Sequence, residues 1–177
     1  MTLKIHISPA VDVLPPDEEL ADMARSGIEE LVKNHLLARN DSRPSRGTMP
    51  NSSYYADAAE TVSSSVNGNK AEVTINQRGV ALHYYGGIVL PTNGRKALSI
   101  PKHPAVHDEK PSTFDPSRQI LKLIWPKGKK AGTLRHKDSG EIYFLLVSKA
   151  KIPADPSVLP TESAMDEAAT KAMESIL

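Results

Sequence analysis

The sequence predicts an α+β fold, in which an antiparallel β-sheet is packed by an N-terminal and a C-terminal helix, with long loops between the elements. Apolar residues recur at helical spacing near both ends of the chain, in residues 17–38 and 161–177. Thr161 or Ser163 can cap the second of these helices. Between the two helices, short runs that favour strands are separated by turn residues such as Asn67-Gly68-Asn69.

Length and composition limit the function. A chain of 177 residues fits one domain, spanning 1–177, around a single core. Its 22 Lys and Arg residues nearly balance 21 Asp and Glu residues, and a net charge of +1 argues against a general binder of polyanions. The absence of cysteine excludes disulfides and thiolate zinc sites. No apolar run could span a bilayer and the N-terminus lacks a signal-peptide core, so we expect a protein made in the cytoplasm with no membrane partner.

The N-terminal part predicts a strand followed by a long helix. Leu3, Ile5 and Ile7 alternate with polar residues, which is typical of a strand. After a Pro-Pro pair, a helix from about Asp17 to Ala38 begins with acidic residues, which the helix dipole favours. Its predicted apolar stripe comprises Leu20, Ala24, Ile28, Leu31 and His35. The acids on its outer face are Asp22, Glu29 and Glu30. They form either a solvated face or a surface for a partner.

A loop, a short helix and a hairpin are predicted next. Residues 40–53 are polar and contain two prolines and a glycine, which is typical of a mobile loop. Tyr54–Glu60 favours a short helix. Thr61–Val66 and Ala71–Ile75 favour two strands, and the Asn-Gly pair between them accepts the positive φ of a tight turn.

The rest of the chain is expected to pack around the stretch Gly79–Pro91. Val80 and Tyr84 lie one helical turn apart. The glycine pair that follows ends this turn, because glycine reaches positive φ without steric cost. Ile88–Leu90 then favours a strand. The predicted structural motif consists of His83, Tyr84, Tyr85, Gly86 and Gly87.

The C-terminal half predicts more strands and a second loop. Leu98–Pro101 favours a strand, whereas residues 101–118 hold four prolines and little periodicity, which indicates a long mobile loop. Strands at 120–125, 132–136 and 141–151 are expected to form a meander at the core of the sheet. The last of them is apolar on both faces, which is typical of a central strand covered on each side.

Two motifs carry a resemblance to a known family. Residues 79–87 read GVALHYYGG and are followed by Lys96-Ala97-Leu98-Ser99-Ile100-Pro101, and residues 152–160 read IPADPSVLP. With these motifs the chain resembles the phage virion morphogenesis family, the tail-completion proteins of Mu-like tailed bacteriophages and prophages. Asp155-Pro156 stands where that family has Arg-Pro, and Val158 where it has an aromatic residue. The resemblance follows the order of elements from residue 17 onward rather than sequence identity.

The resemblance implies a structural protein of tail completion or head–tail joining, with no catalytic residues and no cofactor. Such proteins assemble into a ring where the tail meets the head. The expected partners are further copies of the chain and other neck or tail proteins, and DNA would be met only by passage through the ring. The expected location is the virion, and the cytoplasm of the bacterial host during assembly.

The residues themselves give little support for catalysis. The sequence has no phosphate-loop, nucleophile-elbow or HExxH signature. His103 and His107, with Asp108 and Glu109, have the spacing of metal ligands on a helix, but the neighbouring prolines disfavour that helix. His83 beside two tyrosines could transfer a proton, yet no nucleophile or acid lies near it in sequence. We therefore expect no enzyme, no metal site and no cofactor.

Residues 122–137 form a basic hairpin that contains no acid. Its basic residues are Lys122, Lys127, Lys129, Lys130, Arg135 and Lys137. Three interpretations stay open: a sheet edge protected by lysines, a contact for an acidic protein, or DNA passing through a ring. The alternative function is a small nucleic-acid-binding module that uses this hairpin, although only Trp125 is near enough to stack on a base.

Opposite charges on one subunit suggest how copies could assemble. The acidic first helix and the basic hairpin could pair head-to-tail, and such heterologous contacts form a ring when the rotation closes. The candidate partner contacts are therefore Lys127, Lys129, Lys130, Arg135 and Lys137, together with Glu29 and Glu30. The loops at 40–53 and 101–118 are expected to become ordered only in the assembled virion.

Overall fold

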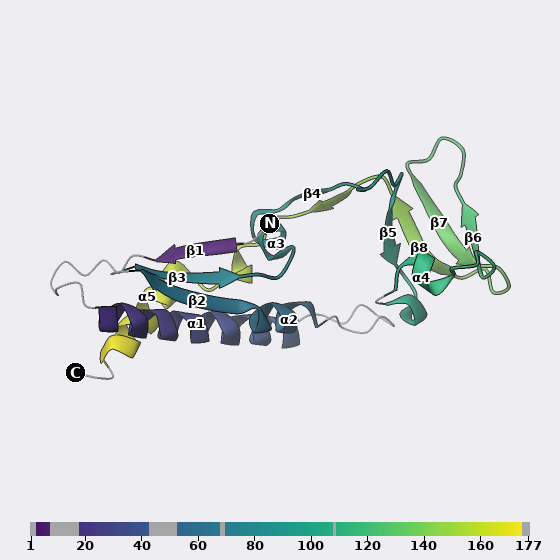
Figure 1. The fold of residues 1–177 in the computed structure, drawn as a ribbon. Coiled ribbons are helices and arrows are strands. Elements are labelled where there is room, and N and C mark those ends of the chain that lie inside the picture. The colour runs from purple at the N-terminus through teal and green to yellow at the C-terminus, as the bar shows by residue number, and fades with distance from the viewer. Residues whose placement is uncertain (1–2, 8–17, 43–52, 68–69, 108, 175–177) are drawn as a thin grey trace. The chain divides into compact units, whose positions relative to one another are not determined.

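A computed structural model of the chain describes residues 3–7, 18–42, 53–67, 70–107 and 109–174 (Figure 1). The fold is mixed α+β, as predicted: an N-terminal and a C-terminal helix pack together and the strands form small antiparallel sheets. Contacts group the chain into two compact units. Unit 1 combines the N-terminal segment with the described residues up to Gly86 and from Pro153 onward, and unit 2 contains residues 87–152. The assignment of 1–177 to a single domain stays a prediction.

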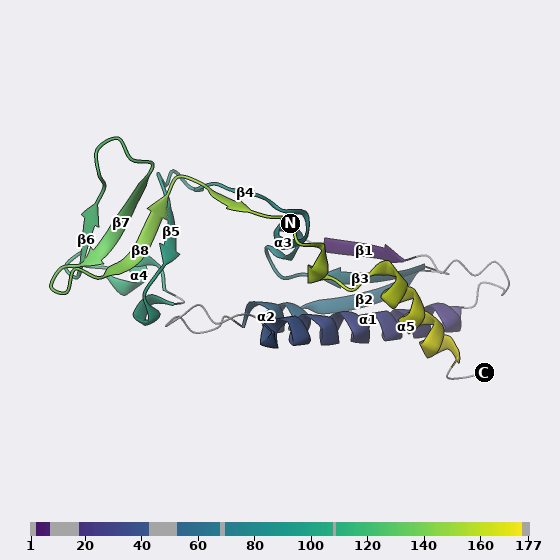
Figure 2. The same ribbon diagram turned by 180° about the vertical axis from the view of Figure 1, so that it is seen from behind.

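In unit 1, helix α1 (Glu18–Asp41) packs against helix α5 (Glu162–Glu174) (Figure 2). Both helices were predicted, and Thr161 caps α5 because its hydroxyl accepts a hydrogen bond from the N–H of Ala164, at 3.3 Å. The two helices approach closely at Gly27, where an added Cβ would lie 2.6 Å from the carbonyl oxygen of Ala168.

The buried stripe of α1 differs from the predicted one. Its buried residues are Ala21, Ala24, Ile28, Val32 and Leu36. Leu20, Leu31 and His35 are only half-buried, so the prediction placed part of the stripe one position away. Two of the five buried residues are alanines, Ala21 and Ala24.

The sheet of unit 1 has the antiparallel order β1-β3-β2, with bounds Leu3–Ile7, Lys70–Ile75 and Val62–Asn67. The predicted hairpin is confirmed, with Val62 opposite Ile75 and Asn67 opposite Lys70; its turn, at 68–69, lies outside the described residues. Alternate residues of β3 are buried in the core, and α1 packs on β3 and β2.

Two short helices complete unit 1. Helix α2 (Tyr54–Glu60) packs on α1, and helix α3 (Val80–Tyr85) contributes the fully buried Val80 to the core, with Tyr84 packed beside it. Gly86 has φ of +71°, so the predicted glycine stop is confirmed. A 3₁₀ turn, η2 (Pro156–Val158), packs against α3.

The main sheet of unit 2 has four antiparallel strands in the order β5-β8-β7-β6. Their bounds are Leu98–Pro101, Ile142–Val147, Ala131–His136 and Leu121–Ile124. The predicted meander is thus confirmed, and β8 is an interior strand. It is not, however, the centre of one sheet covered by both terminal helices, because α1 packs on a separate sheet in unit 1.

One predicted strand of unit 2 is two strands. Residues 141–151 break at Ser148-Lys149, so that β8 ends at Val147 and β9 (Ala150–Ile152) begins a separate ladder. Strand β9 pairs with β4 (Gly87–Val89) rather than continuing along β5 and β7. Strand β4 begins one residue earlier than predicted.

The segment 101–118 contains regular structure that its composition did not predict. It holds a 3₁₀ turn, η1 (Pro104–Val106), and a short helix, α4 (Pro111–Phe114). Val106 is fully buried in the small core of unit 2 with Phe144, Tyr143 and Leu121. Two of its four prolines, Pro104 and Pro111, stand at the first positions of these turns, where proline is tolerated because no backbone N–H is needed. The predicted mobility of this segment stays a prediction; residues 43–52 of the other predicted loop lie outside the described residues.

Candidate functional site

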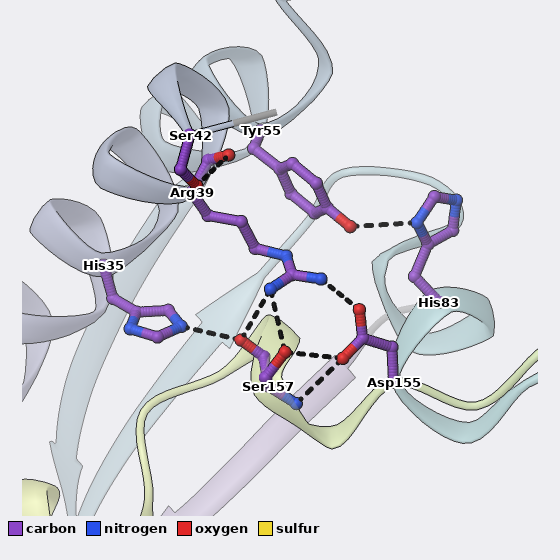
Figure 3. Close-up of polar contacts among 7 residues, drawn as sticks. All are labelled: His35, Arg39, Ser42, Tyr55, His83, Asp155 and Ser157. Atoms are coloured by element: carbon purple, nitrogen blue, oxygen red, sulfur yellow. Dashed lines mark hydrogen bonds and ion pairs between the residues drawn. The ribbon is translucent and has the colours of Figure 1, made fainter. Parts of the chain in front are cut away.

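Unit 1 contains a connected group of polar side chains, here called the polar clasp: His35, Arg39, Tyr55, His83, Asp155 and Ser157 (Figure 3). His35 and Arg39 lie near the end of α1, Tyr55 on α2 and His83 on α3. Asp155 and Ser157 lie at and within η2. The clasp therefore joins four elements that are far apart in sequence.

Arg39 is the centre of the clasp. Its guanidinium forms an ion pair with Asp155 and donates hydrogen bonds to the carbonyl oxygen of Ser157, at 3.1 Å, and to the Ser157 hydroxyl, at 2.9 Å. It also lies over the ring of Tyr55, 5.2 Å from the centroid. Burial by itself lowers the pKa of Arg39, but its interactions with Tyr55 and Asp155 outweigh this effect and raise it.

Asp155 is held ionised by its neighbours. Its carboxylate accepts hydrogen bonds from the hydroxyl of Ser157, at 2.6 Å, and from the N–H of Ser157, at 3.2 Å. The hydrogen bond from the Ser157 hydroxyl, followed by the charge of Arg39, lowers the pKa of Asp155 against the opposing effect of burial. Asp155, which precedes Pro156, thus pairs with an arginine of α1.

His83 takes a structural position in the clasp. Its Nδ1 and the hydroxyl of Tyr55 share a hydrogen bond of 3.0 Å, and its ring stacks on Tyr54 with centroids 5.1 Å apart. The backbone carbonyl of His83 accepts a hydrogen bond from the N–H of Asp155, at 2.9 Å. The phenol that contacts His83 is therefore on α2 and not its sequence neighbour Tyr84. Tyr85 is exposed and has edge-to-face contact with Tyr84.

Ser157 takes part in hydrogen bonds with three residues of the clasp. The hydroxyl of Ser157 donates to the Asp155 carboxylate and accepts from Arg39. His35 reaches the carbonyl oxygen of Ser157, at 2.9 Å, rather than its hydroxyl. The arrangement ties η2 to the end of α1.

The basic residues of the hairpin fall into two groups. Lys127, Lys129 and Lys130 are exposed in the turn between β6 and β7. Arg135 and Lys137 lie at the other end of the hairpin, where Arg135 stands opposite Lys122. Arg135 donates to the carbonyl oxygen of Gly140, at 3.3 Å, and Lys137 to that of Arg118, at 3.2 Å. The candidate contacts predicted from the hairpin therefore do not gather in one patch.

The acids predicted as partner contacts differ in their surroundings. Glu29 is only 20% exposed and forms ion pairs with Arg25, at 3.1 Å, and Lys33, at 2.5 Å. Hydrogen bonds from Lys33 and then from Ser64 of β2 lower the pKa of Glu29. Glu30 is exposed. Glu29 thus joins α1 to the sheet, which leaves Glu30 as the accessible member of the predicted pair.

His103, one of the two histidines with the spacing of metal ligands, has other contacts. His103 stacks on Tyr143 with centroids 4.3 Å apart, and its Nδ1 accepts the N–H of Ala105 as a cap of η1. Asp108 lies outside the described residues. Within the part of the chain that the structure describes, no cluster of three His, Cys, Asp or Glu side chains could hold a metal ion.

Asp115 is a buried polar residue that the sequence did not single out. Its carboxylate accepts hydrogen bonds from three successive backbone N–H groups at the start of β6, at 2.7–3.0 Å. Burial alone raises the pKa of Asp115, but the hydrogen bonds from Leu121, Ile120 and Gln119 outweigh it and lower the pKa. Asp115 thus holds the backbone in place where β6 of the unit 2 sheet begins.

One face of the four-stranded sheet is apolar and lies outside the core of unit 2. Residues opposite one another in an antiparallel ladder share a face, so the register fixes which side chains belong together. The apolar face, as used below, comprises Leu98, Ile100, Ile124, Leu145 and Val147. Ile124 is 38% exposed and the others are half-buried. The opposite face carries Phe144 and Leu134 of the core, and also Leu123, which is 58% exposed.

No known protein family, characterised protein or solved structure matches this chain significantly. The similarity to tail-completion proteins therefore stays a prediction from the motifs. None of the helices in the described residues is both long and apolar enough to cross a membrane.

Proposed function

We propose that this chain is a structural protein of phage or prophage virion morphogenesis, acting in tail completion or head–tail joining by self-association into a ring. The observation that carries the proposal is the apolar face of the unit 2 sheet. Apolar side chains that extend over neighbouring strands outside the core of their unit are typical of a surface that packs against another subunit.

A second copy of the chain is the partner that this surface favours. The rows of the sheet that contain Ile124, Leu145 and Val147 carry no charged residue, so a charged partner would gain nothing there. The first charged row is that of Lys122 and Arg135, at the end of the sheet. In this proposal apolar contact supplies the affinity, and accessible charges such as Glu30 set the orientation of neighbouring copies.

Sedimentation velocity over a range of protein concentrations tests the proposal. Ile124→Lys, on the apolar face, is expected to shift the protein from oligomer to monomer because it places a charge in the interface. Leu123→Lys is a matched control, since this neighbouring residue points to the opposite face and is also exposed. A monomeric wild-type protein at every concentration, or equal loss in both variants, would contradict self-association through this face.

The genomic context offers a second test, directed at the phage origin. If the chain completes tails, capsid, portal and tail-tube genes are expected beside its own. A gene surrounded by unrelated metabolic genes would count against the origin while leaving self-association to be measured separately.

A further inference from the structure

The turn between β6 and β7 holds an indole that is fixed in place yet accessible. Nε1 of Trp125 donates a hydrogen bond to the carbonyl oxygen of Lys129, at 3.0 Å. The six-membered ring lies against Gly132 of β7, where an added Cβ would come within 2.4 Å of Cε3. Trp125 nevertheless remains 41% exposed. An indole that is held in place at both of its fused rings loses little conformational freedom when a ligand stacks on it.

Three lysines lie in the same turn as this indole. Lys127, Lys129 and Lys130 are exposed in the same six-residue connection, and none of them forms an ion pair with a described residue. The sequence from 122 to 137 has no acid that could neutralise them. A ligand for this turn should therefore combine negative charge with a planar group.

We propose that the β6–β7 turn binds single-stranded nucleic acid, with a base stacked on Trp125 and phosphates bound by Lys127, Lys129 and Lys130. A single strand presents both the π-face of its bases and a regular row of phosphates. A duplex hides its base faces in the stack. An acidic peptide would use the lysines but leave the indole without a stacking partner.

A membrane surface fits the indole less well than a base does. Tryptophan at a lipid interface places its apolar rings in the acyl region and directs its N–H to the wet side. Here the N–H is already bonded to the backbone of the same turn. The exposed part of Trp125 is thus a surface for stacking.

This inference goes beyond the proposed structural role and does not rest on it. Trp125 follows Leu123 in the alternation of β6 and lies against Gly132, which shares a face with Leu134. The stacking surface is therefore on the opposite side of the sheet from Ile124 and the apolar face. A chain that fails to self-associate can still bind a single strand, and the reverse also holds.

Intrinsic fluorescence provides a direct test because Trp125 is the only tryptophan in the chain. We expect an oligothymidine strand to quench it at about 50 mM salt, and the logarithm of the affinity to fall with the logarithm of salt at a slope of about −2, from three phosphates at about 0.7 each. The same strand carrying a fluorescent label gives the affinity by anisotropy, so that variants without tryptophan can be measured.

Two sets of variants separate stacking from charge. Trp125→Ala is expected to weaken binding at least about 5-fold, and Trp125→Phe to retain most of the affinity. Changing Lys127, Lys129 and Lys130 together to Gln should bring the salt slope close to zero, whereas Lys171→Gln, an exposed lysine of α5, should leave it unchanged. If Trp125→Ala does not fold, the triple lysine variant and Trp125→Phe still test the proposal.

Other outcomes would overturn it. These are no binding at about 50 mM salt, equal affinity for a duplex of the same length, or binding without quenching. A blue shift of the fluorescence on phosphatidylglycerol vesicles together with weaker binding to oligothymidine would assign the turn to a membrane surface instead. Preferential binding of a poly-glutamate peptide would assign it to an acidic protein.

Discussion

The close contact between α1 and α5 at Gly27 gives a prediction whose sign depends on the structure. In an exposed helix interior, replacing glycine by alanine raises the free energy of unfolding by about 1 kcal/mol. At Gly27 the added Cβ would lie 2.6 Å from the carbonyl oxygen of Ala168 and 2.8 Å from the Cβ of Ala172. The oxygen belongs to a helix backbone and cannot rotate away. Overpacking of this kind costs about 1–3 kcal/mol. Gly27→Ala should therefore lower the free energy of unfolding by about 1 kcal/mol, taking the middle of that range less the helix gain.

Urea unfolding followed by far-ultraviolet circular dichroism measures this effect. Ser26→Ala is the matched control, because Ser26 is the exposed neighbour on the same helix and should gain about 0.5 kcal/mol from helix propensity alone. Gly27→Leu should lower the free energy of unfolding more than Gly27→Ala does, because the leucine side chain is larger. If Gly27→Ala proves as stabilising as Ser26→Ala, the helices do not approach as closely as described, and the reasoning is refuted.

Three further predictions concern charged side chains that hold the fold together. Asp115→Ala should lower the thermal midpoint of the protein, because three backbone N–H groups lose their acceptor; an unchanged midpoint in differential scanning calorimetry would contradict this. Arg39→Met should lower the free energy of unfolding, measured with urea, by about 1–2 kcal/mol. This value is at the low end for hydrogen bonds between charged groups, because Asp155 is 43% exposed and solvent screens the ion pair. Glu29 and Asp155 have lowered pKa values in the folded state, which stabilises the fold at pH values above their ordinary pKa values of 4.5 and 3.8. The thermal midpoint should therefore decrease as the pH falls through these ordinary values toward the lowered pKa values of the folded state. A thermal midpoint that does not change with pH would refute this.

Elements with strong local signals were predictable from the sequence. The hairpin of β2 and β3 follows from an Asn-Gly pair between two short runs, and its pairing was found as expected. The end of α3 follows from Gly86, whose φ of +71° is favoured by glycine alone. In both cases the residues that determine the structure are neighbours in sequence.

Features that depend on distant residues were not predictable. The polar clasp brings Arg39 to Asp155 across 116 positions and Tyr55 to His83 across 28, and no local pattern indicates either contact. Asp115 lies in a proline-rich segment that resembles a loop, and its role depends on the direction in which β6 begins. The break between β8 and β9 likewise depends on β4, which pairs with β9 from far along the chain.

The candidate partner contacts were predicted from charge alone, and the structure shows that their surroundings differ. Glu29 contacts Arg25, Lys33 and Ser64 within unit 1, whereas its role as a partner contact stays a prediction. A stripe of acids on a helix face does not show which member pairs internally, because that depends on the residues of the sheet beneath it. The apolar face of unit 2 was missed because its residues come from four strands whose register the sequence does not give.

Native mass spectrometry of the wild-type protein tests the proposed self-association most directly. A closed ring formed through one repeated contact predicts a single oligomer of defined mass that resists dilution. Ile124→Lys should leave only the monomer, while Leu123→Lys should retain the oligomer. A wild-type spectrum that contains monomer alone, or a ladder of masses without a preferred closed state, would contradict a protein that works by assembling into a ring.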